Sequence, residues 1–207
     1  PDGTKRVMRS DEVGQPRMAE FAAAVVDETF TIVDTFQQYV IPEGWQDWDG
    51  SLLTEMPPGA FEANKLTFDF LRAHGQPVRQ ALEYYSDRLA EGLVPLGYNM
   101  QFDGRQLRGE LRRAGMDDRF NETPNVCAMR SIRAAGIKIP KLNGKGGMPR
   151  LIDCAAHFNV PGYTEEKHHK AADDVFATVL IARALNQMGK LIPPSIYRAK
   201  GLEGGAS

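Results

Sequence analysis

The chain has 207 residues, 42% of them hydrophobic, with a formal net charge of -2 and a pI near 6.1. It is long enough to bury a full core as one domain, and its slightly acidic balance excludes nucleic-acid binding through overall positive charge. The two cysteines, Cys127 and Cys154, suggest no disulfide framework, and neither a membrane-length apolar run nor a signal-peptide pattern is present. We therefore expect a cytoplasmic protein without a membrane partner.

The first half of the chain predicts a β-hairpin followed by helices. Phe21–Val26 is a continuous apolar run, and after a short turn Phe30–Ile41 is extended sequence rich in β-branched and aromatic residues. Residues 42–60 have the prolines and polar residues of a loop. Phe61–His74 and Val78–Leu89 have helical periodicity.

The second half predicts one buried strand and four helices. Leu93–Tyr98 is short and apolar, as expected for a buried strand, and Gly104–Ala114 is an amphipathic helix. Cys127–Ala135 and Leu151–Phe158 are helical in pattern, and the last long helix runs over Ala171–Met188. This order predicts an α/β fold in which a mixed sheet is covered by helices. We expect a single domain at residues 1–200 and a flexible tail at residues 201–207.

Two short segments carry the chemistry. Residues 97–103, Gly-Tyr-Asn-Met-Gln-Phe-Asp, place Asp103 at the carboxyl end of a strand, where open α/β sheets hold their sites. Residues 169–174, His-Lys-Ala-Ala-Asp-Asp, place His169 just ahead of Asp174 at the start of a helix. Two carboxylates and an imidazole that converge on one point would suit metal-assisted hydrolysis.

Each of these residues also has a plain structural explanation. A carboxylate in the first turn of a helix is stabilised by the helix dipole, which by itself would account for Asp103 and Asp174. A single histidine is more often an exposed loop residue, as the neighbouring His168 illustrates. Asp173 is an alternative to Asp174, although its spacing from His169 is one residue shorter than in the family pattern described next.

Taken together, the motifs resemble those of the DnaQ-like 3'–5' exonuclease superfamily, in its DEDDh branch. Residues 97–103 are similar to the second motif of that family, with Tyr98 in place of the usual histidine, and His169-x-Ala171-x-x-Asp174 matches the third motif. The likeness covers roughly residues 14–188 and implies a ribonuclease H-like fold with a mixed central sheet flanked by helices.

The first family motif, Asp-x-Glu on the first strand, is the departure. The acids of the first twenty residues do not form it; they are Asp2, Asp11, Glu12 and Glu20. In relatives, a strand carrying this motif would lead directly into a segment like Pro1-Asp2-Gly3. We therefore expect that the chain begins just after its first strand and that the central sheet lacks that strand.

The resemblance implies phosphodiester hydrolysis with two Mg²⁺ or Mn²⁺ ions, which four carboxylates hold. Asp103 and Asp174 would supply two of the four carboxylates, His169 would be the general base, and Asn99 and Phe102 would support the site. Because the two acids of the first motif are absent, we expect the two-ion site to fail and activity to fall by orders of magnitude.

A basic segment offers candidate substrate contacts. Residues 123–152 contain no Asp or Glu, and their basic side chains could follow a phosphate backbone in a sequence-independent way. An exposed, solubilising face is the equally good alternative. The candidate substrate-binding residues are Arg130, Lys141, Lys145 and Arg150.

The sequence thus predicts a 3'–5' exonuclease acting on single-stranded DNA, with RNA left open and a DNA polymerase or replication protein as a further expected partner. The alternative is a non-catalytic nucleic-acid-binding or polymerase-associated module on the same fold. An activity like that of an oligoribonuclease is a third, weaker interpretation. The presence or absence of the Asp-x-Glu acids in the complete gene distinguishes the first two hypotheses.

Overall fold

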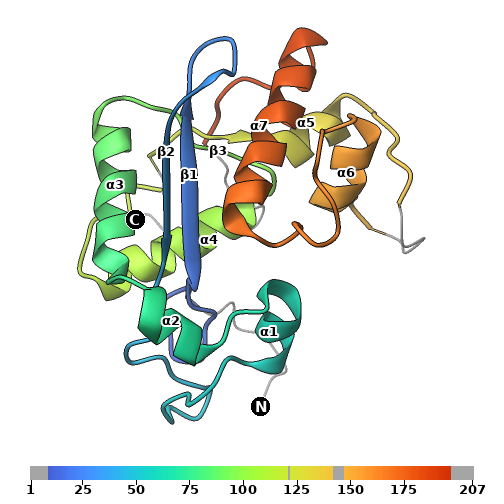
Figure 1. Cartoon of the computed structure of the whole chain (residues 1–207). Helices are drawn as coiled ribbons and strands as arrows, with labels where there is room; N and C mark the ends of the chain where they lie inside the picture. Colours follow the sequence, from blue (N-terminus) through green and yellow to red (C-terminus); the bar gives the residue numbers. More distant parts are fainter. Residues whose placement is uncertain (1–8, 121, 142–146, 197–207) are drawn as a thin grey trace, which may run out of the picture.

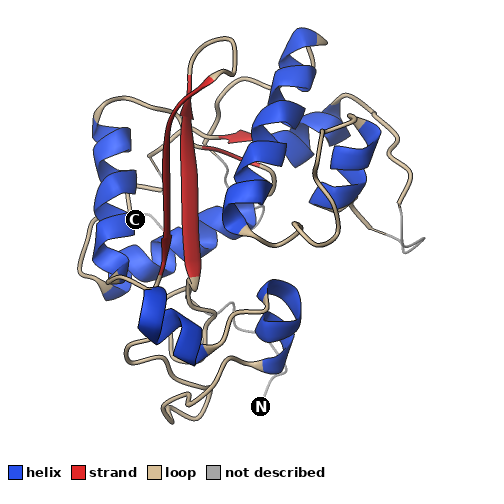
Figure 2. Cartoon of the chain, viewed as in Figure 1, coloured by secondary structure: helices blue, strands red, loops and turns tan. Residues whose placement is uncertain are grey.

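A computed structural model describes residues 9–120, 122–141 and 147–196 of the chain (Figure 1). An antiparallel hairpin stands at the centre, and helices surround it (Figure 2). In chain order the described elements are β1 (Glu20–Val26), β2 (Ile32–Tyr39), α1 (Pro58–Asn64), α2 (Phe68–His74), α3 (Val78–Ala90), β3 (Leu96–Gly97), α4 (Met100–Arg113), β4 (Val126–Cys127), α5 (Ala128–Ala134), α6 (Leu151–His157) and α7 (Ala171–Gln187). The predicted tail at residues 201–207 lies outside the described residues.

The predicted hairpin is confirmed. Strands β1 and β2 pair antiparallel, from Glu20 opposite Tyr39 to Val26 opposite Ile32. The turn is closed by the carboxylate of Asp27, whose Oδ1 accepts hydrogen bonds from the backbone N–H groups of Thr29 at 2.8 Å and Thr31 at 2.9 Å. These bonds satisfy donors that the strands leave unpaired, so the turn supports the register.

The remaining strands are shorter than the sequence predicts. Only Leu96–Gly97 of the expected strand Leu93–Tyr98 is extended, and it pairs in parallel with β4, which the sequence analysis assigned to no strand. In the described residues the hairpin and the β3–β4 pair are two separate two-stranded sheets. The mixed α/β class is confirmed, but the sheet is in two pieces.

The helices follow the predicted pattern with two corrections. The expected helix Phe61–His74 is two helices, because Lys65 adopts a left-handed backbone with φ 59° and ends α1. Helix α2 then begins at Phe68 and is capped by Thr67, whose side-chain oxygen accepts a hydrogen bond from the Phe70 N–H at 3.1 Å. Helix α4 also begins at Met100 rather than Gly104, so it includes Asp103.

Two hydrophobic clusters position the site. One joins the hairpin to α3 and α4 through buried residues that include Phe21, Leu82 and Leu111. The other joins α5, α6 and α7 through buried residues that include Ile132 and Ile181. Helix α7, which belongs to the second cluster, also packs along β1 of the hairpin, so it connects the two clusters (Figure 1).

A buried ion cluster fixes α4 to the segment ahead of β1. The Glu110 side chain is 1% exposed, and its carboxylate accepts two hydrogen bonds from the Arg17 guanidinium, at 2.8 and 3.0 Å. The backbone N–H of Met18 and the guanidinium of Arg113 each donate to the same carboxylate at 3.1 Å. Because every donor is charged or rigid, the buried charge is well compensated.

Both cysteines are buried and unoxidised, and both touch Tyr98. The Cys127 thiol donates to the Tyr98 carbonyl at 3.3 Å, and the Tyr98 hydroxyl lies 3.1 Å from the Cys154 sulfur. Burial raises the pKa of the Cys154 thiol to about 11. Among the described helices, none combines the length and the apolar character needed to cross a bilayer.

Candidate metal and catalytic site

The start of α4 brings Asp103 up against β3. The helix opens at Asn99, whose carbonyl accepts hydrogen bonds from the N–H groups of Phe102 at 2.8 Å and Asp103 at 3.3 Å. A Cβ atom at Gly97 would lie only 3.0 Å from both Asp103 Oδ2 and the Met100 sulfur. The glycine of the motif therefore leaves room for the carboxylate beside the strand.

Asp103 carries a charge that the protein does not balance. The side chain has no hydrogen-bond donor among the described residues, and the protein crowding it together with the negative charge of Asp174 raises its pKa to about 6. Asp103 is exposed, so neighbouring protein atoms desolvate its carboxylate in part without shielding the residue from water. The effect of Asp174 on this pKa shows that the two motifs converge.

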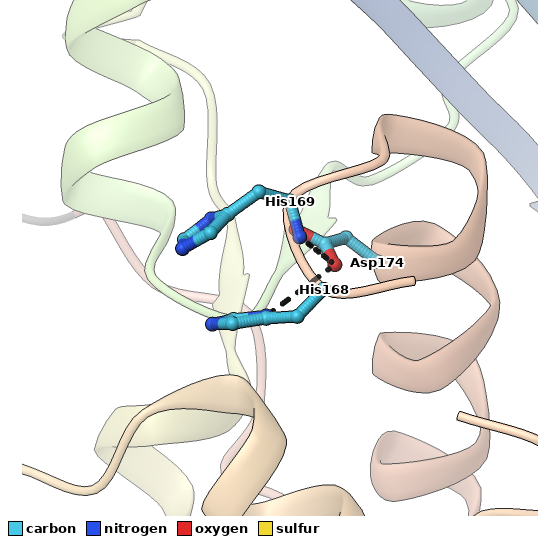
Figure 3. Close-up of side chains that lie close together, drawn as sticks. All are labelled: His168, His169 and Asp174. Atoms are coloured by element: carbon cyan, nitrogen blue, oxygen red, sulfur yellow. Dashed lines mark hydrogen bonds and ion pairs between the residues drawn. The ribbon is translucent and has the colours of Figure 1, made fainter. Parts of the chain in front are cut away.

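Asp174, by contrast, is surrounded by donors. It lies in the first turn of α7, and its Oδ1 accepts hydrogen bonds from the Tyr163 hydroxyl and from the backbone N–H of His169 at 3.2 Å. The Nδ1 atom of His168 lies 3.8 Å from the same oxygen (Figure 3). It also lies 2.9 Å from the Tyr163 hydroxyl. Two hydrogen bonds thus orient the carboxylate, and His168 contacts the tyrosine that donates one of them.

His169 is exposed and conformationally constrained. Its backbone has φ 70°, a left-handed conformation that costs a non-glycine residue energy. Its ring stacks on that of His168, with centroids 3.8 Å apart and planes tilted by 29° (Figure 3). Desolvation and then the nearby His168 lower the pKa of His169 below its ordinary value, so the ring is neutral at pH 7.

These residues fit a divalent cation. His168, His169 and Asp174 each offer one ligand atom, and these atoms lie within 4.8 Å of one another. Asp103 lies outside this group, but the effect of Asp174 on its pKa places a second carboxylate nearby. Carboxylate oxygens suit Mg²⁺ or Mn²⁺, and a neutral imidazole nitrogen also suits Mn²⁺ among other transition metals.

The predicted substrate-binding residues have separate surroundings. Arg130 donates to the Ser195 hydroxyl at 3.0 Å, and Lys141 donates to the Gly147 carbonyl. The guanidinium of Arg150 lies 3.5 Å from carboxylate oxygens of both Asp153 and Glu165. These three side chains thus have different partners, and Lys145 lies outside the described residues.

A hollow lies beside the start of α4 and encloses about 600 Å³, including space open to solvent. Polar amides, two arginines and apolar side chains share its wall. The lining residues are Asn99, Met100, Gln101, Phe120, Asn125, Cys127, Met129, Arg130, Arg133 and Met148. Of the predicted residues, Asn99 and Arg130 line this hollow, and Phe102 is exposed close by with 58% of its surface accessible.

The sequence analysis did not assign a role to Tyr163 or His168. Tyr163 lies in a loop with no motif around it, so only the folded structure brings its hydroxyl to Asp174. His168 is visible as the neighbour of His169, but adjacency in sequence does not reveal that its ring lies between Tyr163 and His169.

No protein-family model matches the chain, and no curated protein matches it. Solved structures of 3'-exonucleases do share its fold. Over 83% of this chain, the structure of E. coli exonuclease I in complex with a dA16 oligonucleotide superposes with a TM-score of 0.58 and 22% identity. The chain spans only 37% of the length of that exonuclease I chain.

Two further structures match over most of both chains. A full-length 3'-exonuclease superposes with a TM-score of 0.66 and 17% identity, covering 95% of this chain and 85% of the other. The nuclease domain of 3'hExo, a DEDDh family member bound to rAMP, has a TM-score of 0.62 and 17% identity, covering 89% and 90% of the two chains. The chain therefore shares the fold of these exonucleases, the ribonuclease H-like fold that its second and third motifs predict.

Proposed function

We propose that this chain is a 3'–5' exonuclease of the DEDDh type, which hydrolyses phosphodiester bonds at the 3' ends of single-stranded DNA. The observation that carries the proposal is the approach of Asp103 and Asp174, which lie some seventy positions apart in the chain, with His169 beside Asp174. A fold alone hosts many activities, so the argument depends on these three side chains.

Asp103 and Asp174 would hold Mg²⁺ or Mn²⁺, two ions in a complete site. Such ions, when bound, stabilise the charge that develops on the attacking and leaving oxygens of the phosphodiester. Asp103 has no donor among the described residues and would gain a counterion. The donors around Asp174 fix its carboxylate before any ion arrives, which lowers the cost of ordering the site.

His169 would accept the proton of the attacking water. Its lowered pKa keeps the imidazole neutral at pH 7, and its exposed position leaves the ring accessible to solvent. Stacked on His168, the ring keeps a nitrogen within 4.8 Å of an Asp174 carboxylate oxygen, so the base would lie beside this metal ligand. Tyr163 and His168 would orient the carboxylate of Asp174 and take no part in proton transfer.

The hollow beside α4 would take part of the nucleic acid. Arg130 and Arg133 supply positive charge for a phosphate, and the methionines and Phe120 supply apolar contacts for a base. Phe102 offers an exposed ring for stacking next to Asp103. Arg150 and Lys141 are further proposed contacts, and a polymerase or replication partner and a cytoplasmic location remain predictions.

Either nucleic acid fits this surface, since no residue identified here reads a 2'-hydroxyl. Structures of the same fold include one with a dA16 oligonucleotide and one that describes the 3'-end specific recognition of a histone mRNA stem-loop by a 3'-exonuclease. We take DNA as the substrate because it is the commoner one in the family that the sequence resembles, and RNA is a test of specificity.

A second candidate function is a non-catalytic nucleic-acid-binding or polymerase-associated module. The observation that favours it is that the 207 residues contain no Asp-x-Glu. With two carboxylates of the four, the site would hold its ions weakly, and we expect cleavage orders of magnitude slower than by a complete site.

The test is cleavage of a 5'-labelled single-stranded DNA oligomer with Mn²⁺, beside an Asp174→Ala variant and an unlabelled RNA competitor. A ladder of shortened products that Asp174→Ala abolishes would establish the nuclease. Binding of the oligomer without any ladder would favour the binding module. A chain that neither binds nor cleaves the oligomer would refute both proposals.

A further inference from the structure

Helix α7 begins without a cap from its own sequence. The first N–H groups of a helix have no partner within it, and a polar side chain just ahead of the helix usually accepts from one of them. Lys170 occupies that position here and offers no acceptor. The N–H of Ala171, the first residue of α7, instead donates to Oε2 of Glu20 at 3.1 Å.

Glu20 is itself held by the hairpin. It is the first residue of β1, and the side chain of Gln37 on β2 donates to its Oε1 at 2.7 Å. Since Ala22 is the partner of Gln37 in the ladder, Glu20 and Gln37 are diagonal neighbours on one face of the hairpin. The two oxygens of Glu20 thus bind two different elements, one the rigid hairpin and the other the start of α7.

The hydrogen-bonded residue of α7 lies inside the third motif. Ala171 follows His169 by two residues and precedes Asp174 by three. The segment from His169 to Asp174 begins with the left-handed backbone of His169, a strained conformation that persists only where the surrounding structure restrains it. A contact at Ala171 restrains both the strained residue before it and the first turn that carries Asp174.

We propose that Glu20 is a positioning residue, which fixes His169 and Asp174 relative to the hairpin through its hydrogen bond to the Ala171 N–H. The inference rests on the proposed function for the chemistry that it serves, but the restraint itself can be measured without activity. Glu20 would not contact the substrate. It acts through the backbone of α7.

A merely structural cap would behave differently. If Glu20 only stabilised α7, its loss would loosen the whole helix and lower the thermal stability, without a specific effect at residues 169–174. If it positions the site, the effect is local: exchange of these amides rises, the affinity for Mn²⁺ falls, and kcat falls more than KM changes.

The experiment compares hydrogen exchange and Mn²⁺ binding in the wild-type chain and the variants Glu20→Ala, Glu20→Gln and Glu28→Ala. Glu28 is an exposed carboxylate in the turn of the same hairpin and serves as the charge-matched control. In Glu20→Ala we expect the amides of residues 169–174 to exchange about fivefold to tenfold faster, as for the loss of one cap, and Mn²⁺ affinity to fall by a similar factor.

The glutamine variant keeps one side-chain oxygen for the Ala171 N–H, so we expect it to restore most of the protection, and Glu28→Ala to match wild type. Unchanged exchange at residues 169–174 in Glu20→Ala would overturn the proposal, as would a uniform rise over all of α7. If Glu20→Ala does not fold, Gln37→Ala releases only Oε1 and should give a smaller local rise; no rise there would also overturn it.

Activity separates the two proposals. A wild-type chain that neither binds Mn²⁺ nor cleaves DNA would refute the proposed function, while the exchange data would still report on the restraint. Where the wild type is active, Glu20→Ala should lower kcat with little change in KM, and Glu20→Gln should recover it. Equal loss in the Glu28→Ala control would count against a role for this contact.

Discussion

Two carboxylates on α4 lie two turns apart on one face of the helix and have opposite surroundings. Glu110 is 1% exposed, and Arg17, Arg113 and the Met18 N–H all donate to it. Asp103 touches solvent, receives no hydrogen bond among the described residues and has a pKa raised to about 6. The degree of burial does not by itself show whether a carboxylate is compensated, because Glu110 is the more buried of the two and also has the hydrogen-bond donors.

The difference separates a carboxylate that serves folding from one that is available to a ligand. A folded chain gains little from leaving a crowded carboxylate without a donor, and such groups concentrate at functional sites. Asp174 lies between the two extremes, since Tyr163 and the His169 N–H bind one of its oxygens.

The largest expected effect tests the folding side of the comparison. Glu110→Ala leaves Arg17 and Arg113 without their buried counterion, so we expect a loss of about 3–5 kcal/mol in the free energy of unfolding. Thermal or urea denaturation measures it, with Glu122→Ala as an exposed control. A loss below about 1 kcal/mol would mean that the arginines find other partners and that Glu110 is not the anchor described.

Next in size is the loss of a proposed metal ligand. In Asp174→Asn we expect the affinity for Mn²⁺ to fall by at least about tenfold, because a charged oxygen ligand becomes neutral. Calorimetric titration measures the change. Asp173→Asn is the matched control in the same turn, where the carboxylate lies 3.5 Å from Lys167. Equal losses in both variants would indicate nonspecific attraction by negative charge.

Removing the hydroxyl that orients Asp174 should have an effect of similar size. We expect Tyr163→Phe to lose about 1.5 kcal/mol of stability, the usual contribution of a partly buried hydrogen bond to a charged group. Tyr84→Phe is a paired control, because its hydroxyl donates to Asp34 at 3.0 Å on an exposed surface. Urea denaturation at pH 7 compares them, and a loss in Tyr84→Phe as large as in Tyr163→Phe would contradict the ranking.

The smallest effect has the opposite sign. Because the pKa of Asp103 is raised from 3.8 to about 6 in the folded chain, ionisation of this carboxylate begins to destabilise the fold above about pH 4 and does so fully above pH 6. Without metal, Asp103→Asn should therefore stabilise the chain by roughly 1 kcal/mol at pH 7, a figure reduced for solvent screening of an exposed group.

This advantage should disappear as the pH falls from 6 toward 4, because the wild-type carboxyl then takes up its proton in the folded state first. Unfolding free energies measured against pH in the presence of a chelator would reveal the trend. An asparagine variant that is less stable than wild type at pH 7 would mean that Asp103 has a stabilising partner.

Much of this arrangement could be predicted from local sequence. The hairpin, α3 and α7 have long periodic patterns, and the motif glycine and aspartates have fixed spacing along the chain. The break at Lys65 was missed because one left-handed residue does not interrupt the apolar pattern around it. Strands β3 and β4 have two residues each, too few for a period to be read.

The supporting contacts could not be predicted, for a different reason. Tyr163 lies in an irregular loop eleven positions before Asp174, and Glu20 reaches Ala171 from the other end of the chain. Such pairs depend on the tertiary packing of α7 along β1, and neither residue belongs to a recognised spacing. The raised pKa of Asp103 likewise could not be predicted, because it depends on the protein atoms and the Asp174 carboxylate that folding brings near it.

The buried thiols have a practical consequence. Cys127 is 2% exposed, Cys154 is 0% exposed, and the raised pKa of Cys154 leaves almost none of it as the reactive thiolate at neutral pH. A cysteine introduced on the surface, for example at the exposed Gln101, should react with maleimide probes far faster than either native thiol. Fluorophores and spin labels can therefore be attached beside α4 without first replacing Cys127 or Cys154, whose contacts with Tyr98 support the core next to the site.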